Sequence, residues 1–197
     1  MLTPQGYRHR WPLAFIFMTN DAFIVPLKRF DVAKDRLRQG GTADVDQLAR
    51  DLAIGVLDAC APRHVIVLSE SDEVSRFARE RDVEVLESHA LDLNGAVQHA
   101  YESLGRRFER LVIVHGDLRR PRGLGDFEPG PGVTIVTDHR ARGTNVLVVP
   151  TGLDFRFAYG PDSAQRHEFE ARRLGVACLV VTDSPWRFDV DEPSDLH

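Results

Sequence analysis

Residues 111–117 read Leu-Val-Ile-Val-His-Gly-Asp, an unbroken apolar run that ends in a histidine, a glycine and an acid. A short run of β-branched residues that is apolar on both faces is typical of a strand covered by helices on both sides of a sheet. Comparable runs recur along the chain and predict further strands. Together with 111–114, we expect strands at 23–27, 65–68, 83–86, 133–136, 145–149 and 177–181.

Helical patterns alternate with these strands. Apolar residues recur every three or four positions over 45–60 and over 93–108, which indicates two amphipathic helices. A shorter, charged helix is expected at 71–81. Strands that alternate with helices predict an α/β fold of three layers around a largely parallel sheet. Ligands of such sheets bind beyond the carboxyl ends of the strands.

A fourth helix is expected from about Ser163 to Leu174. Asp162 precedes it and Gln165 follows three residues later, which is the spacing of a capping box. Gly175 stands just after the last expected turn, where a glycine commonly ends a helix. These signals predict both ends of the helix.

Composition limits the function classes. The chain has 197 residues, 43% of them hydrophobic and 28% charged, as expected of one globular domain. Its net charge of −5 argues against a nucleic-acid-binding surface, and no run approaches the ~20 apolar residues of a membrane span. We therefore expect a cytoplasmic protein without nucleic-acid or membrane partners. Residues 1–20 are expected to be an N-terminal extension of uncertain order, and residues 21–197 the folded domain.

Three cations follow the first expected strand on one connection: Lys28, Lys34 and Arg36. That placement suits a triphosphate, because ammonium and guanidinium groups neutralise and hydrogen bond to phosphate oxygens. The alternative is an ordinary solvated basic loop. The chain has neither a Walker sequence nor a G-x-G-x-x-G segment, so the two commonest phosphate-binding loops are absent from the sequence.

Acidic residues occupy two places where a cation could bind. Asp117 comes directly after the apolar run at 111–114, at the expected carboxyl edge of the sheet. Asp189 and Asp191 are separated by one residue, so alternation puts both carboxylates on one side of an extended segment. Carboxylate oxygens suit Mg²⁺, which also binds substrate phosphates. The alternative for 189–192 is a helix N-terminus, because Pro193 favours a first helical turn.

Three polar segments complete the candidate site. Residues 138–145 offer Gly143 and Thr144 in a tight turn, or simply form a hairpin loop. Residues 159–163 open the fourth helix, with His167 one turn later, and could bind an anion at the helix N-terminus or merely cap it. Asn94 stands at the start of another helix, where its amide could contact a nucleobase edge or act as an N-cap.

In their order along the chain, these segments resemble those of the guanylyltransferases of deazaflavin coenzyme F-420 biosynthesis, which act on 2-phospho-L-lactate or phosphoenolpyruvate. The resemblance covers about residues 21–196. The segment Asp189-Val190-Asp191-Glu192-Pro193-Ser194-Asp195-Leu196 matches the closing Asp-Val-Asp-x-Pro-x-Asp-Leu of that family in full. The other matching segments are Pro26-Leu27-Lys28, Ala33-Lys34-Asp35-Arg36-Leu37, Leu93-Asn94, Gly116-Asp117-Leu118, Gly143-Thr144-Asn145 after Asp138, and Tyr159-Gly160-Pro161-Asp162-Ser163 before His167.

The resemblance implies a single-domain, three-layer, Rossmann-like nucleotidyltransferase fold with a mostly parallel, mixed sheet. It implies that the phosphate of a three-carbon acid attacks the α-phosphorus of GTP and that pyrophosphate leaves. Mg²⁺ is the implied cofactor, GTP and the acid are the implied partners, and a homodimer is a further expectation. By the same resemblance, the catalytic and triphosphate-binding residues are Lys28, Lys34 and Arg36, the guanine-binding residue is Asn94, the Mg²⁺ ligands are Asp117, Asp189 and Asp191, and the acid-binding residues are Thr144, Gly160 and Ser163.

Departures from the family pattern keep other functions open. Asp35 stands where the family has a small hydroxyl residue, Arg119 where it has a proline, and Asp162 where it has a glycine. One alternative is another acceptor, such as 3-phosphoglycerate, and a second is a degenerate nucleotide-binding protein without turnover. A third is a nucleotidyltransferase for sugar phosphates or molybdopterin, but those usually begin with a glycine-rich segment ending in Arg-x-x-x-Lys, which the first expected strand lacks.

Overall fold

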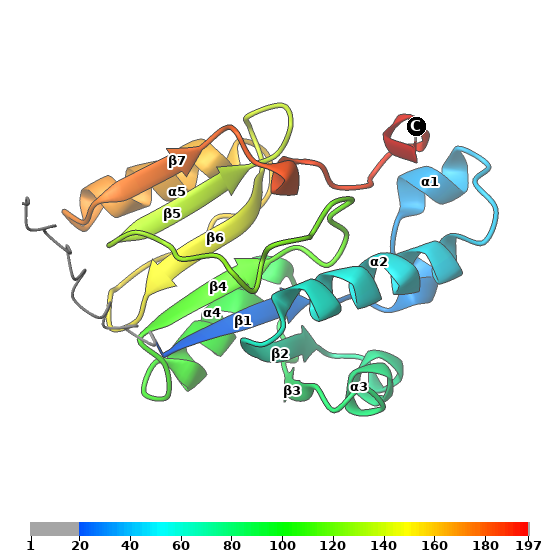
Figure 1. Ribbon diagram of the computed structural model, residues 1–197, viewed down its shortest axis with the longest axis horizontal. Helices are drawn as coiled ribbons and strands as arrows, with labels where there is room; N and C mark the ends of the chain where they lie inside the picture. Colours follow the sequence, from blue (N-terminus) through cyan, green and yellow to red (C-terminus); the bar gives the residue numbers. More distant parts are fainter. Residues whose placement is uncertain (1–19, 197) are drawn as a thin grey trace, which may run out of the picture.

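The computed structural model describes residues 20–196, and a single sheet of seven strands forms its centre (Figure 1). The expected extension at 1–20 lies outside the described residues except for Asn20. The strands are β1 (Asp21–Pro26), β2 (His64–Ser69), β3 (Glu84–Glu87), β4 (Arg110–Val114), β5 (Val133–Thr137), β6 (Thr144–Pro150) and β7 (Cys178–Val181). All seven expected strands are confirmed, with ends that lie within two residues of the expected ones.

The strand order is β3-β2-β1-β4-β6-β5-β7, with β6 as the antiparallel member. β1 pairs in parallel with β2 and β4, β2 with β3, and β5 with β7. β6 runs antiparallel to both β4 and β5. The mostly parallel, mixed sheet is therefore confirmed. Because β6 runs the other way, its first residues lie at the edge of the sheet where β4 and β5 end.

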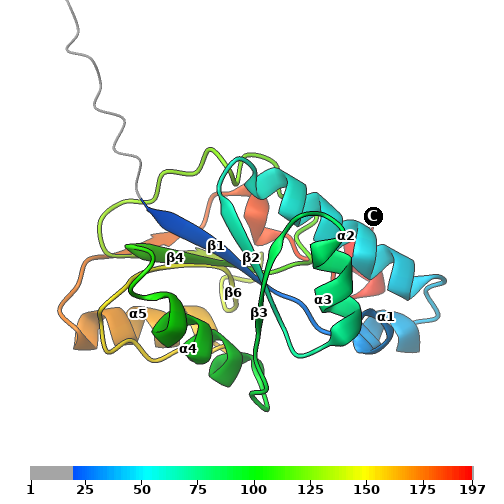
Figure 2. The ribbon, with the colours of Figure 1, turned by 90° about the horizontal axis from the view of Figure 1, so that it is seen from below.

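Helices cover both faces of the sheet and make three layers. The four longer helices are α2 (Val45–Cys60), α3 (Asp72–Arg79), α4 (Leu93–Leu104) and α5 (Ser163–Arg173). Figure 2 shows α4 and α5 on one side of the sheet and α2 on the other. Within residues 20–196, none of the helices has the length and apolar character that crossing a membrane requires.

Strand β4 explains why the strands are apolar on both faces. Leu111 and Ile113 pack in the core with α4 and α5, whereas Val112 and Val114 pack in the core with α2 and α3. All four side chains are fully buried. Since successive side chains of a strand point to opposite faces, a strand between two helical layers needs apolar residues at every position.

The expected end of one helix and the expected cap of another are wrong. The second amphipathic helix ends at Leu104 instead of 108; Gly105 is its C-cap, and Phe108 is buried from the loop that leads into β4. α5 begins at Ser163 as expected, and Asp162 is its N-cap residue, but the Asp162 backbone is left-handed (φ 56°) and its side chain makes no capping hydrogen bond. Its carboxylate instead accepts a hydrogen bond from Arg142 Nε at 2.7 Å. Gly175, with φ 68°, does follow the last turn of α5 as expected.

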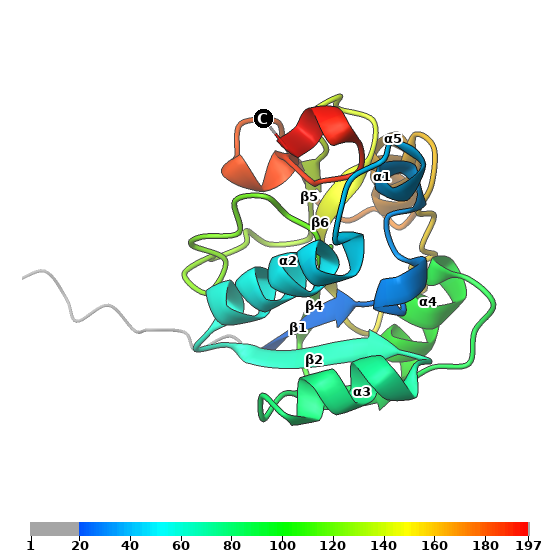
Figure 3. The same cartoon turned by 90° about the vertical axis from the view of Figure 1, so that its right-hand side faces the viewer.

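The C-terminal tail returns to the edge of the sheet after β7. It contains two 3₁₀ turns, η2 (Pro185–Arg187) and η3 (Pro193–Leu196), and passes beside the short helix α1 (Asp35–Gln39) (Figure 3). Val190 is 2% exposed and packs against Leu37 and Val45. Leu118 and Asp189 form an antiparallel bridge. The tail is thereby fixed between α1 and the segment that follows β4.

Gly132→Ala tests how tightly the sheet edge is packed at the start of β5. Gly132 has φ +85°, and a Cβ there would collide with the backbone carbonyl of Ala177. We expect the free energy of unfolding to fall by about 2 kcal/mol or more, because a strained backbone and a fixed carbonyl both oppose the methyl group. Urea denaturation measures the change.

Gly130→Ala is the matched control, because a Cβ at Gly130 meets nothing within 4 Å and its φ is not positive. Its free energy of unfolding should stay within about 0.5 kcal/mol of that of the unaltered protein. If both variants lose the same free energy of unfolding, the close approach of Gly132 to the Ala177 carbonyl is not the reason that glycine is needed at position 132.

Candidate functional site

Three aspartates from two segments meet at the carboxyl edge of the sheet. Asp117 follows β4, and Asp189 and Asp191 lie on the C-terminal tail. Two backbone hydrogen bonds join the segments, from Arg119 N to Phe188 O at 2.7 Å and from Val190 N to Asp117 O at 3.1 Å. Because Val190 is buried, the residues on either side of it share the opposite face, as the spacing predicts.

Lys34 supplies the positive charge of this acidic cluster. Its Nζ donates to Asp117 Oδ2 and to Asp191 Oδ1, the latter at 2.9 Å, and its side chain is 8% exposed. Burial works against the ammonium, but the two carboxylates outweigh it and raise the pKa of Lys34. In the same way, burial opposes the charge of Asp191, yet Lys34 holds the pKa of that carboxyl below its usual value.

Asp189 lacks this compensation. Burial, followed by the negative charges of Asp117 and Asp191, raises its pKa. Its Oδ1 accepts a hydrogen bond from Asn145 Nδ2 at 3.3 Å, and Asn145 also donates to Trp186 O at 3.1 Å. Asn145, the second residue of β6, therefore anchors the tail to the sheet. No sequence pattern predicts this role of Asn145, although the residue belongs to the candidate segment 138–145.

The acidic cluster fits a hard divalent cation by its chemistry. All its possible metal ligands are carboxylate oxygens, three carboxylates lie close together with one ammonium that pairs with two of them, and Asp117 Oδ1 is buried without a hydrogen-bond partner among residues 20–196. As they stand, however, no three His, Cys, Asp or Glu side chains between residues 20 and 196 are arranged to hold a metal ion. The ammonium of Lys34 lies between two of the expected ligands, so a metal here requires Lys34 to move.

The other two expected phosphate-binding cations lie at the surface. Lys28 is exposed after β1 and forms no ion pair within residues 20–196. Arg36, on α1, is 69% exposed and stands 3.6 Å from Glu192 on the tail. The structure therefore brings only Lys34 into the acidic cluster and leaves Lys28 and Arg36 accessible from solvent. Their contacts with a triphosphate stay predictions.

A buried hydroxyl network lies at the start of β6. Ser163 Oγ donates to Thr144 Oγ1 at 3.1 Å, and His167 Nδ1 lies 3.1 Å from the same oxygen. His167 Nε2 accepts from the Ala158 N–H at 3.0 Å, so the proton of the neutral ring is on Nδ1 and is donated to Thr144. Burial, together with the nearby His115, lowers the pKa of His167 to about 4. The network is thus held by a neutral imidazole.

Asn94 fixes the loop that precedes α5. Its Oδ1 accepts from Tyr159 N at 2.6 Å, and its Nδ2 donates to Tyr159 O at 3.2 Å. The N-cap of α4 is Asp92, which accepts from Gly95 N at 2.8 Å. Gly160 follows with φ +117°, a conformation that favours glycine. Contact of Asn94 with guanine stays a prediction. A guanine bound there would have to share the Asn94 amide with the Tyr159 backbone.

The loop between β5 and β6 is a hairpin, as the alternative interpretation of 138–145 proposed. Asp138 N donates to Gly143 O at 3.1 Å, and Asp138 Oδ1 accepts from Arg142 N at 2.7 Å. A Cβ on Gly143 would crowd the Asp138 carboxylate. The hairpin places Thr144 next to the ends of β4 and β5.

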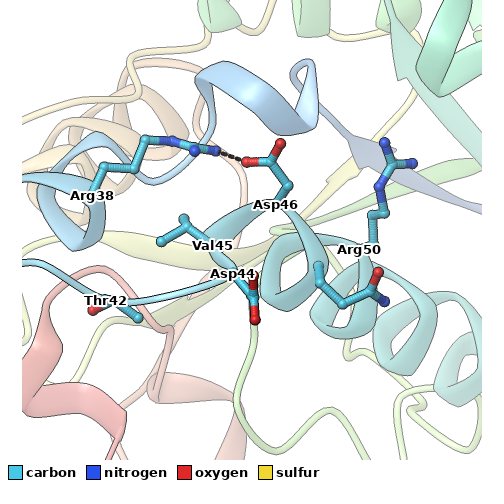
Figure 4. A pocket seen from close by; sticks show the side chains of 7 residues that line it. Arg38, Thr42, Asp44, Val45, Asp46 and Arg50 are labelled. Carbon is cyan, nitrogen blue, oxygen red and sulfur yellow. Dashed lines mark hydrogen bonds and ion pairs between the residues drawn. The ribbon is translucent and has the colours of Figure 1, made fainter.

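A surface hollow of about 540 Å³ lies between α1 and the start of α2 (Figure 4). Its positive side chains are already paired, Arg38 with Asp46 and Arg50 with Glu73. None of the expected site residues line it. We therefore place the candidate site at the acidic cluster and the hydroxyl network. The lining residues of the hollow are Arg38, Thr42, Asp44, Val45, Asp46, Gln47 and Arg50.

Comparison with protein families and curated proteins identifies related sequences. A family model described as "Guanylyl transferase CofC like" matches residues 21–197. Phosphoenolpyruvate guanylyltransferase of Roseiflexus castenholzii is 32% identical over 179 residues, which cover 88% of this chain and 84% of that protein. 2-Phospho-L-lactate guanylyltransferase of Methanothermobacter thermautotrophicus is 29% identical over 190 residues, covering 88% and 81%.

Solved structures share the fold at low sequence identity. A nucleotidyl transferase from Methanothermobacter thermautotrophicus superposes with a TM-score of 0.61 at 15% identity, covering 89% of this chain and 94% of that one. 4-Diphosphocytidyl-2C-methyl-D-erythritol synthase from Anaerococcus prevotii gives 0.59 at 9% identity, covering 90% and 93%. The expected Rossmann-like nucleotidyltransferase fold is confirmed.

Lys34→Gln tests whether the acidic cluster binds a divalent cation. Without the ammonium, the carboxylates stay partly buried with no counter-charge, so the free energy of unfolding in metal-free buffer should fall by about 2–4 kcal/mol. Added Mg²⁺ should raise the Tm of this variant more than that of the unaltered protein, because the ion binds the folded state. Thermal unfolding with and without Mg²⁺ measures both effects.

Lys28→Gln is the control for that experiment. Lys28 is exposed and unpaired within residues 20–196, so neither the Tm nor its response to Mg²⁺ should change. If Mg²⁺ stabilises Lys34→Gln no more than it stabilises the unaltered protein, the acidic cluster is not a metal site.

His167 should make stability depend on pH between about 4 and 6.5. The pKa of the folded-state imidazole is about 4, below its ordinary 6.5, so the unfolded chain binds more protons in this window. Stability is fully present above pH 6.5 and falls as the pH drops, by about 2 kcal/mol between pH 7 and pH 5. The measurement is urea denaturation of the unaltered protein and of His167→Gln, in which that slope should largely disappear. Parallel slopes in both proteins would contradict the buried neutral imidazole.

Proposed function

The chain belongs to the CofC-like guanylyl transferase family, and we propose that it joins GMP from GTP to the phosphate of a phosphorylated three-carbon acid. A phosphate oxygen of the acid attacks the α-phosphorus of GTP, the bond from that phosphorus to the bridging oxygen breaks, and pyrophosphate leaves. The proposed acids are phosphoenolpyruvate and 2-phospho-L-lactate, which the names of the relatives specify. The proposed setting is coenzyme F-420 biosynthesis.

One observation supports this proposal most strongly: the acidic cluster, Lys34 and the hydroxyl network all lie at the same edge of the sheet. This reaction needs alignment of two phosphates and neutralisation of their charge, without a covalent nucleophile. The aspartates and Lys34 provide charged groups, and the buried hydroxyl network fixes the polar start of β6 beside them. Both substrates could therefore bind at one edge.

Each side chain has a proposed part. Asp117, Asp189 and Asp191 would hold Mg²⁺, which when bound neutralises charge on the phosphate oxygens. Lys34, released from the aspartates, would contact the triphosphate together with Lys28 and Arg36. Thr144, Gly160 and Ser163 would bind the acid. Asn94 would orient the loop that presents Gly160, through its two hydrogen bonds to Tyr159.

A nucleotide-binding protein without turnover is the second candidate. The observation that favours it is the position of Lys34, which occupies the space between two expected metal ligands. Another acceptor, such as 3-phosphoglycerate, leaves the machinery unchanged and differs only in the acid. A homodimer and a cytoplasmic location stay predictions.

Pyrophosphate release distinguishes these functions. Purified protein with Mg²⁺ and GTP should release pyrophosphate when phosphoenolpyruvate or 2-phospho-L-lactate is added, and should release none without an acid. Release with 3-phosphoglycerate alone would establish a different acceptor. GTP binding without release for any of the three acids would favour the binding protein.

Asp189→Asn tests the acidic cluster in turnover. The substitution keeps the size of the side chain and removes its charge, so kcat should fall by a factor of about 100 or more. Asp183→Asn, an exposed change on the same tail, is the control and should keep full activity. Near-normal kcat in Asp189→Asn would remove Asp189 from the mechanism.

A further inference from the structure

Two buried polar atoms beside the candidate site lack hydrogen-bond partners among residues 20–196: His115 Nε2 and the Tyr159 hydroxyl oxygen. Their rings are neighbours, with centroids 5.6 Å apart. Tyr159 is 7% exposed, and burial raises its pKa, so its hydroxyl stays protonated and remains a donor. Buried polar groups are nearly always hydrogen bonded, so two neighbouring buried atoms without partners indicate a place where a ligand can bind.

Both residues lie between the acidic cluster and the hydroxyl network. His115 directly follows β4, two residues before Asp117, and its backbone N–H donates to the backbone oxygen of Asn145 at 3.0 Å. Asn145 in turn holds Asp189. Tyr159 directly precedes Gly160, and its ring meets that of His167 edge-on at 4.9 Å. The pair therefore connects the acidic cluster, which we assign to the phosphates, with the hydroxyl network, which we assign to the acid.

The donors already described leave one group of the acid without a partner. Ser163 donates to Thr144, and Thr144 Oγ1 faces both Ser163 and His167, so these hydroxyls are partly occupied. The phosphate of the acid must approach the acidic cluster to reach GTP. Its carboxylate, a few bonds away, accepts hydrogen bonds only and needs donors nearby.

We propose that His115 Nε2 and the Tyr159 hydroxyl donate hydrogen bonds to the carboxylate of the phosphorylated acid and make the site specific for acids. This inference rests on the proposed function and adds a residue pair to it. A tyrosine hydroxyl is a donor, and an imidazole nitrogen that carries a proton is a donor too, so each residue supplies one bond. A phosphate ester without a carboxylate would leave both atoms buried and unpaired, and such sites discriminate strongly against the smaller analogue.

Four variants test the pair. Tyr159→Phe removes one oxygen, and His115→Phe removes both ring nitrogens. His115→Gln keeps an amide donor near the position of Nε2 and should restore part of the lost function. Tyr101→Phe is the matched control, because it also removes a buried hydroxyl, one that donates to Pro150 O at 2.6 Å away from the site.

The measurements are KM for the acid, KM for GTP, and the ratio of kcat/KM for 2-phospho-L-lactate to that for ethyl phosphate, which is the same ester without the carboxylate. In Tyr159→Phe and His115→Phe, KM for the acid should rise about tenfold or more, since each loses a hydrogen bond to an anion. KM for GTP should not change, and the preference for the acid over ethyl phosphate should fall by the same factor. Tyr159→Phe should keep its Tm, because the Tyr159 hydroxyl has no hydrogen-bond partner among residues 20–196.

The outcomes separate this inference from the proposed function. Normal turnover with an unchanged preference for the acid in both phenylalanine variants would overturn the inference and leave the guanylyltransferase proposal standing. A rise in KM for GTP equal to that for the acid would also overturn it, because the pair would then act on the whole site. If the unaltered protein neither releases pyrophosphate nor binds the acid by calorimetry, both proposals fail.

Discussion

Three negative charges at one edge of the sheet need a positive partner, and this requirement organises the site. Asp117 and Asp191 bind the same ammonium, while Asp189 is left with a raised pKa. Lys34 reaches them because α1 lies against the C-terminal tail, with Leu37 and Val190 packed together. The short helix, the tail and the segment after β4 thus hold one another in place through a charge balance. A bound cation and a triphosphate would alter that same balance.

The direction of β6 determines what stands beside the charges. An all-parallel sheet would put the start of a strand at the opposite edge, but β6 runs antiparallel between β4 and β5. Its first residues, Thr144 and Asn145, therefore lie next to the ends of its neighbours. Thr144 opens the hydroxyl network and Asn145 holds Asp189. One reversed strand brings the acid-binding and metal-binding parts of the proposed site together.

The loop before α5 is held by contacts that leave it little freedom. Asn94 binds both backbone polar groups of Tyr159, and His167 binds the Ala158 N–H from the other side. A neutral imidazole suits this place, because burial disfavours a charged ring more than the nearby Glu170 carboxylate favours it. A rigid loop presents Gly160 and Ser163 with little loss of conformational entropy when a substrate binds. Asn94 and His167 therefore preorganise the loop, although their place in the sequence motifs suggested direct contact with a ligand.

The sequence by itself determined the layers, the strands and the identity of the charged residues, because these depend on local patterns. Runs apolar on both faces identified strands between two helical layers, and the spacing of Asp189 and Asp191 placed both on one side of a buried Val190. The expected extension of the second helix to 108 and the expected side-chain cap by Asp162 were wrong, since the helix ends before Gly105 and the Asp162 carboxylate pairs with Arg142. Only the tertiary structure decided that Lys34 neutralises Asp117 and Asp191, residues 83 and 157 positions away, and that Asn94 binds a loop. Such partners depend on strand order and on the path of the tail, which no short stretch of sequence contains.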